Sequence, residues 1–284
     1  MLTATCLLGG PGITDRTTHG HDPDRFVQLG SLSKVMTGTV MMRLRDQGVI
    51  DLDAPLQDYL AEVPRGTGIT LRHLAEHTSG LPRLPPGDTG PADDPYAGFS
   101  DVALNELLHD LDGVAVEPPG TETYSNLGYA VLGRALTEVS GRTYQQLVDE
   151  CVLEPLGLEA GAVTAHPPAD RRLVARTLFG RPRAPWTLTG PILPAGGLWS
   201  TPRTVASVVV RLLVEHRLGP PAPTWRSGGN SSLLWHNGAT RGASAIAVAH
   251  DDGRWLLLHR LSGNGARTDR MAIKEFEASA PSRT

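Results

Sequence analysis

The order in which strand and helix patterns follow one another is what most constrains the fold of this 284-residue chain. Apolar runs bounded by turn residues predict strands at 3–8 and 26–29, and again at 233–235, 243–250 and 254–261. The segment between these two groups has the apolar spacing of helices. Strands at both ends around a helical middle predict an α/β domain with a mostly helical insertion, and a cleft between the two is the natural site.

The chain divides accordingly into two expected parts. Residues 1–58 and 165–284 would form the α/β domain, and residues 59–164 the mostly helical subdomain, with the active site in the cleft between them. The polar and proline-rich segment 83–98 is expected to be a surface loop. Helical patterns begin at Ser31 and are also found at 101–112, 127–139 and 143–153.

Composition excludes several classes of protein. Charged residues make up 20% and apolar residues 40% of the chain, with a net charge of −4, so a polyelectrolyte, a coiled coil and a disordered chain are excluded. The basic surface of a nucleic-acid-binding protein is also missing, and no apolar run approaches the length of a membrane helix. These observations predict neither a nucleic-acid partner nor a membrane partner.

The N-terminal residues and the two cysteines indicate a compartment. The first residues lack the basic region of a secretory signal, and Cys6 and Cys151 form no metal-binding or redox motif. We therefore expect two buried thiols in a soluble, cytoplasmic protein.

The use of lysine draws attention to one position. Of the 26 basic residues, 24 are arginine and only Lys34 and Lys274 are lysine. Arginine stays protonated in proteins, whereas a buried lysine can lose its proton and act as a base. Lys34 lies three residues after Ser31, directly after a predicted strand, so the two side chains share one face of a helix start. A neutral amine there can accept the proton of the serine hydroxyl and activate it as a nucleophile.

Two further segments carry residues that suit the same chemistry. In Tyr124-Ser125-Asn126 a phenol can exchange protons and an amide can position a carbonyl group. In His236-Asn237-Gly238-Ala239, at the end of a predicted strand, glycine allows close approach to the backbone, where an N–H can bind an oxyanion.

Together the three segments resemble the superfamily of serine β-lactamases, DD-peptidases and esterases, whose motifs are S-x-x-K, Y-x-N and a K/H-x-G strand. The middle motif looks like the class C and esterase branch. The likeness covers about residues 25–261 and includes FVQLGSLSKVMTG, ITLRHLAEHTSGLP, PGTETYSNLGYAVLG and PAGGLWST in the family's order. It implies an α+β fold (an α/β sandwich), in which an antiparallel sheet is flanked by helices and carries the inserted helical subdomain.

The resemblance also implies roles for these residues. Ser31 would be the nucleophile, Lys34 and Tyr124 would share the role of general base, and Asn126 would orient the acyl group. The backbone N–H groups of Ser31 and Ala239 would hold the oxyanion beside Gly238, and His236 would lie near the leaving group. The reaction would need no cofactor and no metal, and would pass through an acyl-enzyme.

Departures from the family pattern bear on the substrate. β-Lactamases carry Lys-Thr-Gly where this chain has His236-Asn237-Gly238, so a fixed charge becomes a histidine that is mostly neutral near pH 7. Recognition of a substrate carboxylate weakens accordingly, with Arg241 as a candidate substitute. The five tryptophans are too scattered for a binding box, but Trp199 is a candidate for lining the cleft. A small-molecule ester or amide is the expected substrate, by hydrolysis or acyl transfer; a lactam or a D-aminoacyl peptide is the alternative. The oligomeric state stays open.

Two other interpretations compete with this one. His73, Glu76 and His77 match the H-x-x-E-H pattern of zinc peptidases, with Glu150 or Glu154 as a third ligand. The same letters belong to the ITLRHLAEHTSGLP segment of the serine family, which favours a structural helix and turn. A catalytically silent binding domain of this fold is the second alternative.

Overall fold

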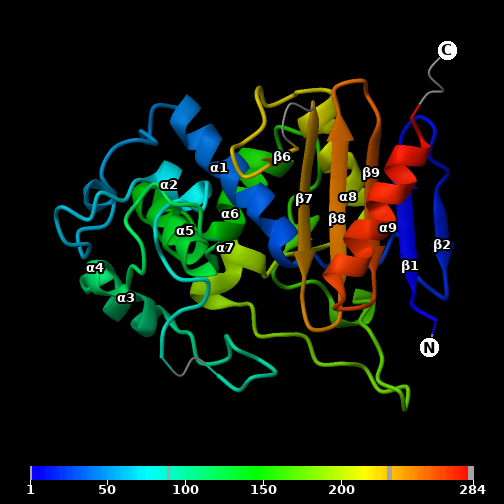
Figure 1. Ribbon diagram of the computed structural model, residues 1–284, viewed down its shortest axis with the longest axis horizontal. Helices are drawn as coiled ribbons and strands as arrows, with labels where there is room; N and C mark the ends of the chain where they lie inside the picture. The colour runs from blue at the N-terminus through cyan, green and yellow to red at the C-terminus, as the bar shows by residue number, and fades with distance from the viewer. Residues whose placement is uncertain (1, 88–89, 229–231, 281–284) are drawn as a thin grey trace.

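The computed structural model describes residues 2–87, 90–228 and 232–280. A six-stranded sheet, in which every paired strand is antiparallel, runs in the order β2-β1-β9-β8-β7-β6. Figure 1 shows this sheet to one side of a group of helices. Its strands are β1 (Thr5–Gly9), β2 (Arg16–Thr18), β6 (Arg226–Ser227), β7 (Leu233–Ala239), β8 (Ser244–His250) and β9 (Trp255–Arg260).

The predicted strands and their turns explain most of the sheet. The strands expected at 243–250 and 254–261 are β8 and β9, and the Asp251–Gly253 turn joins them as predicted. The strand expected at 233–235 extends four residues further, through the His-Asn-Gly segment, as β7. β2 was not expected, because its residues are all exposed and polar, and it forms by pairing with the edge of β1.

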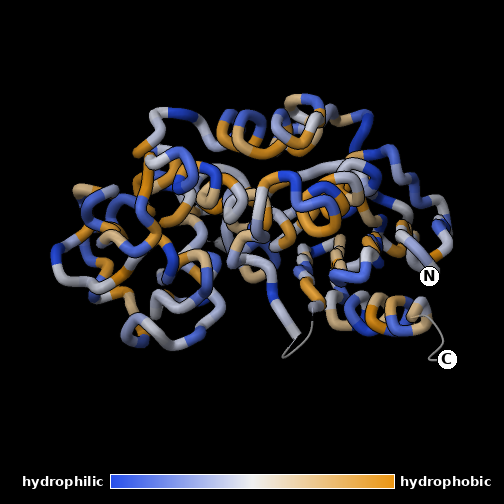
Figure 2. Tube along the Cα trace, turned by 90° about the horizontal axis from the view of Figure 1, so that it is seen from above, coloured by the Kyte–Doolittle hydropathy of each residue, from blue (hydrophilic) through white to orange (hydrophobic). Residues whose placement is uncertain are grey.

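Helices cover both faces of this sheet. On one face lie α8 (Pro202–Val209) and its continuation as a π-helix, η6 (Val210–Val214), and on the other lies α9 (Gly265–Ala278). Figure 2 shows the C-terminal helix as the outer layer of the molecule. Ala272 and Phe276 of α9 pack on Leu7 and Ile246 of the sheet. This apolar cluster, which is separate from the main core described below, holds α9 on its face of the sheet.

The remaining helices form the other part of the molecule. Ser31 lies in a short 3-10 helix, η1 (Gly30–Ser33), which continues as α1 (Lys34–Asp46), so the helix expected from Ser31 has a tighter first turn. The helix expected at 101–112 is split in two. The elements that follow α1 are η2 (Leu56–Asp58), α2 (Leu71–Ala75), α3 (Asp101–His109), α4 (Leu111–Val114), α5 (Asn126–Ser140), α6 (Tyr144–Val148) and the π-helix η3 (Asp149–Leu153).

A small second sheet joins the two parts. It has the order β3-β5-β4, and its middle strand pairs with both neighbours through two residues each. It holds the segment before Ser31 in place, because β3 leads directly into η1. The remaining elements are β3 (Val27–Gln28), β4 (Val163–Thr164), η4 (Ala169–Arg171), η5 (Gly190–Ile192), α7 (Leu193–Gly196) and β5 (Trp199–Ser200).

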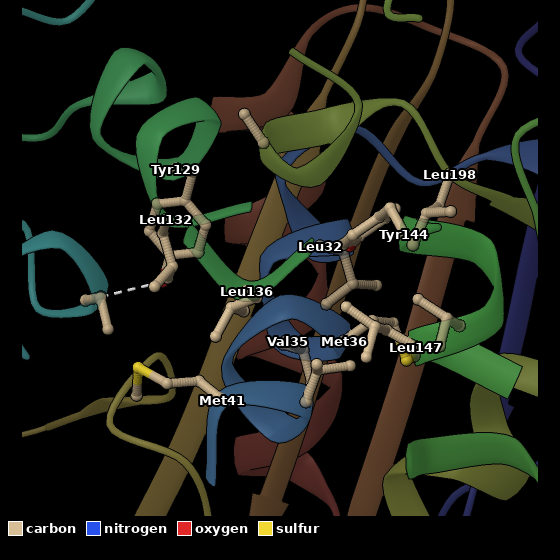
Figure 3. Packing of buried hydrophobic residues seen from close by; sticks show 14 of the residues in the cluster. Leu32, Val35, Met36, Met41, Tyr129, Leu132, Leu136, Tyr144, Leu147 and Leu198 are labelled. Carbon is tan, nitrogen blue, oxygen red and sulfur yellow. Dashed lines mark hydrogen bonds between the residues drawn. The ribbon is translucent and has the colours of Figure 1, made fainter. Parts of the chain in front are cut away.

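The main core surrounds α1. Figure 3 shows Leu32, Val35 and Met36 between side chains of α5 and α6, among them Tyr129, Leu132, Leu136 and Leu147. This core also includes Leu257 of the sheet, so apolar packing is continuous from the helices to the strands. The division into two parts near residues 58 and 165 therefore stays a prediction, since one apolar cluster extends across both parts.

Two further expectations can be compared with the structure. Cys6 and Cys151 are both buried and free, as predicted. Within the three described ranges, no helix has both the length and the apolar character needed to cross a membrane.

Candidate active site

Ser31 and Lys34 lie at the junction of β3 and α1, where the chain turns sharply. Gly30 has a φ of +54°, a conformation that favours glycine, and it lets the backbone leave β3 and enter η1. Lys34 is the first residue of α1 and is completely buried, whereas Ser31 is only half-buried. The three-residue spacing brings the amine to 3.3 Å from the Ser31 hydroxyl.

The Lys34 amine has three hydrogen-bond partners. Nζ donates to Asn126 Oδ1 at 2.8 Å and to the carbonyl oxygen of Ala195 at 2.6 Å. Both of these oxygens can only accept, so they take two of the amine protons. In the neutral amine the remaining position is a lone pair directed at Ser31 Oγ, and in the ammonium form it is a third proton. The contacts therefore accommodate both protonation states.

The surroundings favour loss of the lysine proton. Burial lowers the pKa of Lys34, and the neighbouring charge of Arg83 lowers it further, while the interaction with Tyr124 opposes the shift. Nζ also lies 5.0 Å from the ring centroids of both Tyr124 and Tyr129, a position in which the rings partly stabilise the cation. The net direction for the Lys34 pKa is downward.

Tyr124 is the second side chain that contacts the serine hydroxyl. Its hydroxyl lies 2.6 Å from Ser31 Oγ, closer than the amine does. The turn that carries it is held by His77, whose carbonyl oxygen accepts from Thr123 N at 2.7 Å and whose Nδ1 accepts from Ser125 N at 3.1 Å. The His77 ring also packs on the Tyr124 ring, with centroids 4.4 Å apart. Tyr124 is thereby fixed from the backbone and from one face.

The Tyr124 hydroxyl is more acidic than a free phenol. Burial alone would raise the pKa of Tyr124, but the charge of Lys34 and the hydrogen bond with Ser31 outweigh burial and lower it. Arg83, whose guanidinium carbon lies 5.0 Å from the ring centroid, acts in the same direction. The pKa values of Lys34 and Tyr124 are therefore both lowered in one connected group.

The end of β7 packs against the start of η1. A Cβ atom on Gly238 would lie 2.2 Å from Leu29 O and 2.7 Å from Ser31 N, and a Cβ on Gly30 would lie 2.8 Å from Ala239 N. Both glycines are therefore needed for the two backbones to approach this closely. Gly238 thus admits the chain's own helix start, a structural reason that sequence reasoning did not give.

This packing also orients the Ala239 amide. Thr240 N donates to Ala243 O across the β7–β8 ladder, so the alternation of an antiparallel pair directs the Ala239 N–H away from β8. Among the described residues, β6 pairs with β7 at Leu234 and Trp235, so the edge of β7 at Ala239 is open towards η1. The backbone amides of Ser31 and Ala239 consequently both lie where the end of β7 packs against η1.

His236 is neutral in this environment. Burial, followed by the charge of Lys34, lowers the pKa of His236 to about 3. Its Nδ1 lies 2.8 Å from the carbonyl oxygen of Asn237, which can only accept, so Nδ1 carries the proton and Nε2 is an acceptor. Asn237 in turn donates to Asp269 Oδ2 at 2.8 Å. The position that is lysine in β-lactamases thus holds no charge at neutral pH.

A cleft of about 290 Å³ opens beside Ser31. Ser31, Asn126 and Ala239 contribute to its lining, and Leu84, Leu188 and Ile192 give it an apolar wall. Among the described residues that line this cleft, Arg83 is the one with a charged side chain. An apolar wall with a few polar groups at one end is typical of a site for a small organic molecule.

Two residues that were predicted as candidates for the cleft, Arg241 and Trp199, interact with other parts of the chain. The guanidinium of Arg241 forms an ion pair with Asp93 at 2.9 Å, so its charge is matched within the chain. Trp199 is buried in β5 under the guanidinium of Arg172 and is not among the described residues that line the cleft. Trp199 belongs to β5, the middle strand of the second sheet, and sequence reasoning did not predict its burial there.

A comparison with known sequences identifies the family. The family model described as Beta-lactamase matches residues 7–275 of this chain. The chain belongs to the beta-lactamase family. One curated relative, the D-alanyl-D-alanine-carboxypeptidase/endopeptidase AmpH of Escherichia coli (strain K12), is 36% identical over 184 residues, which are 63% of this chain and 46% of the relative. The chain spans about half the length of the curated relatives it matches.

Solved structures of the beta-lactamase fold agree with the architecture. A class C beta lactamase from Rhodobacter sphaeroides has a TM-score of 0.79 at 18% identity, with 96% of this chain and 93% of that chain covered. A beta-lactamase/D-alanine carboxypeptidase from Yersinia pestis has a TM-score of 0.75 at 21% identity, with 98% and 93% covered. The predicted fold of an antiparallel sheet flanked by helices is therefore confirmed.

The beta-lactamase-like cleft also contains residues that sequence reasoning missed. The segment 83–98 was expected to be a surface loop, and residues 88–89 of it lie outside the described residues. The described part of the segment is a mostly exposed loop, as expected. Within it, however, Tyr96 is buried against Trp186 and accepts a hydrogen bond from Asn126 Nδ2 at 2.7 Å. The only signal in the sequence was an aromatic residue within a polar segment, and nothing local paired it with Trp186.

The zinc interpretation is not supported by the arrangement of its residues. α2 ends at Ala75, and His77 follows with a φ of +62°, so His73 and His77 do not share one helical face. His77 Nδ1 is occupied by the Ser125 amide. Within the described ranges, no group of three histidine, cysteine, aspartate or glutamate side chains could hold a metal ion.

Proposed function

We propose that this chain is a serine hydrolase that forms an acyl-enzyme on Ser31 and acts on small-molecule esters or amides. The observation that carries the proposal is the position of Ser31 Oγ, which lies within hydrogen-bond distance of both a buried amine and a half-buried phenol. An unaided serine hydroxyl is a weak nucleophile, and an adjacent base activates it. Membership of the beta-lactamase family supports the same chemistry.

The proton of Ser31 has two destinations, Lys34 Nζ and the Tyr124 hydroxyl oxygen. In one arrangement Lys34 is a neutral amine and Tyr124 a neutral phenol; in the other Lys34 is an ammonium and Tyr124 a phenolate. The two arrangements hold the same number of protons. Attack by Ser31 Oγ then delivers its proton to Nζ or to the phenolate, and both routes end in an ammonium beside a neutral phenol. Ser31 Oγ lies 2.6 Å from the Tyr124 hydroxyl oxygen and 3.3 Å from Lys34 Nζ, and the shorter distance favours the tyrosine oxygen as the atom that receives the proton.

The rest of the cycle uses the backbone beside the serine. Ser31 Oγ bonds to the carbonyl carbon, and the negative charge on the carbonyl oxygen is stabilised by the amides of Ser31 and Ala239. The protonated Tyr124–Lys34 pair gives its proton to the leaving alcohol or amine as the carbonyl–heteroatom bond breaks. A water molecule then attacks the acyl-enzyme and loses its proton to the same pair. The pair returns this proton to Ser31 Oγ as the bond between Oγ and the acyl carbon breaks and the acid is released.

The charges around the cleft support a small substrate with an anionic group. His236 is neutral, and Arg241 is paired with Asp93, so neither offers a free cation to a substrate. Arg83 lines the cleft and forms no ion pair with any carboxylate in the described part of the chain. Its guanidinium is suited to a carboxylate on the substrate. The volume of the cleft favours a small molecule over a long peptide.

A second candidate function is removal of a terminal D-alanine from a peptide. The name of the Escherichia coli relative, a D-alanyl-D-alanine-carboxypeptidase/endopeptidase, favours this candidate. The neutral His236 argues against this candidate, because it does not provide the positive charge that would bind the terminal carboxylate of the peptide.

A substrate panel tests both candidates. The purified chain is assayed against p-nitrophenyl esters of graded length, with and without a terminal carboxylate, against nitrocefin, and against D-alanyl-D-alanine peptides. We expect short esters to be hydrolysed with a burst equal to one equivalent of enzyme, and the Ser31→Ala variant to show neither burst nor turnover. Peptide turnover faster than ester turnover would support the second candidate. No burst with any substrate would support a silent binding domain.

A further inference from the structure

A second hollow, of about 270 Å³, lies between α9 and the edge of the sheet. Figure 1 shows α9 beside β1 and β2, the strands that border this hollow. None of the described residues that line it also lines the cleft beside Ser31. We call it the α9 groove, and the residues that matter for its chemistry are Thr5, Arg16, Thr18, Arg260, Arg267 and Glu275.

The fold places basic side chains on both walls and on the floor of the α9 groove. Arg260 of β9 is in register with Thr5 of β1, so both contribute to the floor. On α9, Arg267 and Glu275 are eight residues apart and lie on one side of the helix, which forms one wall. Arg16 of β2 forms the opposite wall.

Arg260 is buried, and no carboxylate of the described residues pairs with it. Only 3% of this residue is exposed, and within the described ranges its side chain makes one hydrogen bond, from Nη1 to Thr268 Oγ1 at 3.4 Å. Its Nε is buried and finds no hydrogen-bond partner among the same residues. A buried guanidinium with unsatisfied donors is costly, and proteins normally match such a group with an anion.

The other charges of the groove do not match it. The carboxylate of Glu275 is taken by Arg16, which reaches it across the groove. In the described part of the chain, neither Arg260 nor Arg267 forms an ion pair with a carboxylate. Burial, followed by the charge of Arg267, lowers the pKa of Arg260. The groove thus contains three arginines and one carboxylate, and the charge that remains after Arg16 pairs with Glu275 is that of two guanidinium groups.

We propose that the α9 groove binds a small tetrahedral oxyanion, a phosphate group either free or on a small organic molecule, between Arg260 on its floor and Arg267 on its wall. Donors that come from the floor and from two walls surround an anion on three sides, which suits a tetrahedral anion better than a planar carboxylate. The hydroxyl of Thr18 is a further donor at the same place. The site is independent of the active-site cleft.

Binding of inorganic phosphate to the full chain tests this proposal. Isothermal titration calorimetry is performed in a phosphate-free buffer whose ionic strength is kept constant with chloride. We expect one saturable site in the wild type, and a dissociation constant raised about tenfold or more in Arg267→Gln, because one charge-assisted hydrogen bond is lost. Arg267 is exposed, so this variant should fold normally. Arg260→Met, which keeps the apolar stem, should abolish the site.

Two controls make the result decisive. Lys274→Gln removes an exposed charge from α9 outside the groove and should bind phosphate like the wild type. Glycerol 3-phosphate distinguishes the two sources of the anion: tighter binding than inorganic phosphate identifies an organic phosphate, and equal binding identifies the free ion. Absence of saturable binding in the wild type, or an unchanged dissociation constant in Arg267→Gln, would overturn the proposal.

Discussion

Tyr124 is the residue whose role the geometry defines most closely. Its hydroxyl is the nearest titratable group to Ser31 Oγ, so Tyr124→Phe should lower kcat/KM by about 10²- to 10⁴-fold. The buried Lys34 amine keeps its contact with the serine in this variant, so some activity should remain. Steady-state kinetics on an ester substrate measure the effect. Tyr59→Phe, which removes a phenol bonded to Asp51, is the control, and a loss below tenfold for Tyr124→Phe would reduce its role to positioning.

Arg83 should contribute to the pH range of activity. Its charge lowers the pKa of both Lys34 and Tyr124, and activity requires that this pair has lost one proton. In Arg83→Gln both pKa values rise, so the ascending limb of the kcat/KM profile should move to higher pH. The profile is measured with a neutral ester, so that loss of an anion contact does not interfere. The exposed Arg217→Gln should leave it unchanged, and an unmoved limb in Arg83→Gln would contradict the assigned coupling.

At the residue scale, the sequence predicted the groups that share a motif and missed those that meet only in the fold. Ser31 and Lys34 are three residues apart, so their contact follows from helix geometry alone. The contact of Tyr124 with Ser31 spans 93 residues, and only the family resemblance brought them together. His77 was noted for zinc chemistry, yet its ring and backbone support Tyr124.

At the scale of elements, the close contact of β7 with η1 should be sensitive to a single methyl group. In Gly238→Ala the new Cβ would lie 2.2 Å from Leu29 O, so β7 must move away from η1. Because the Ala239 amide moves with it, we expect kcat to fall about 10²- to 10³-fold, as for loss of an oxyanion donor. Gly196→Ala is the control, since its Cβ would make only ordinary contacts, at 3.5 Å or more. Unchanged kcat in Gly238→Ala would exclude this edge from the oxyanion site.

Whole elements were predictable where the local pattern was long and regular. α5 and the β8–β9 hairpin follow from apolar periodicity, a serine cap and a turn sequence. β2 and the two-residue strands of the second sheet carry no such pattern, because pairing with a neighbour creates them. The burial of Tyr96 depends in the same way on a contact with Trp186, 90 residues further along the chain.

At the scale of the whole molecule, four buried histidines should make the fold sensitive to acid. Burial lowers the pKa of His21 to about 4, of His236 to about 3 and of His77 to about 2, and lowers that of His259 well below its usual value. The unfolded chain binds protons at these histidines below about pH 6.5, whereas the folded chain does not. The free energy of unfolding therefore falls as the pH is lowered.

Each such histidine contributes a slope of about 1.4 kcal/mol per pH unit between its two pKa values. The four together predict a loss of about 5 kcal/mol per unit near pH 5, a large share of the stability of a typical domain. Urea unfolding at a series of pH values measures this slope. Replacing one of the four, as in His77→Gln, should reduce the slope by about 1.4 kcal/mol per pH unit, which is the contribution of one proton. Equal stability at pH 7 and pH 5 would show that these histidines are not neutral in the folded protein.

The central claim is that Ser31 is a nucleophile made reactive by the Lys34–Tyr124 pair. The most direct measurement is labelling with a fluorophosphonate, followed by intact-mass analysis and peptide mapping of the adduct. We predict one adduct per chain, located on Ser31, formed more slowly in Tyr124→Phe and not at all in Ser31→Ala. An adduct on another residue, or none in the wild-type protein, would contradict the account.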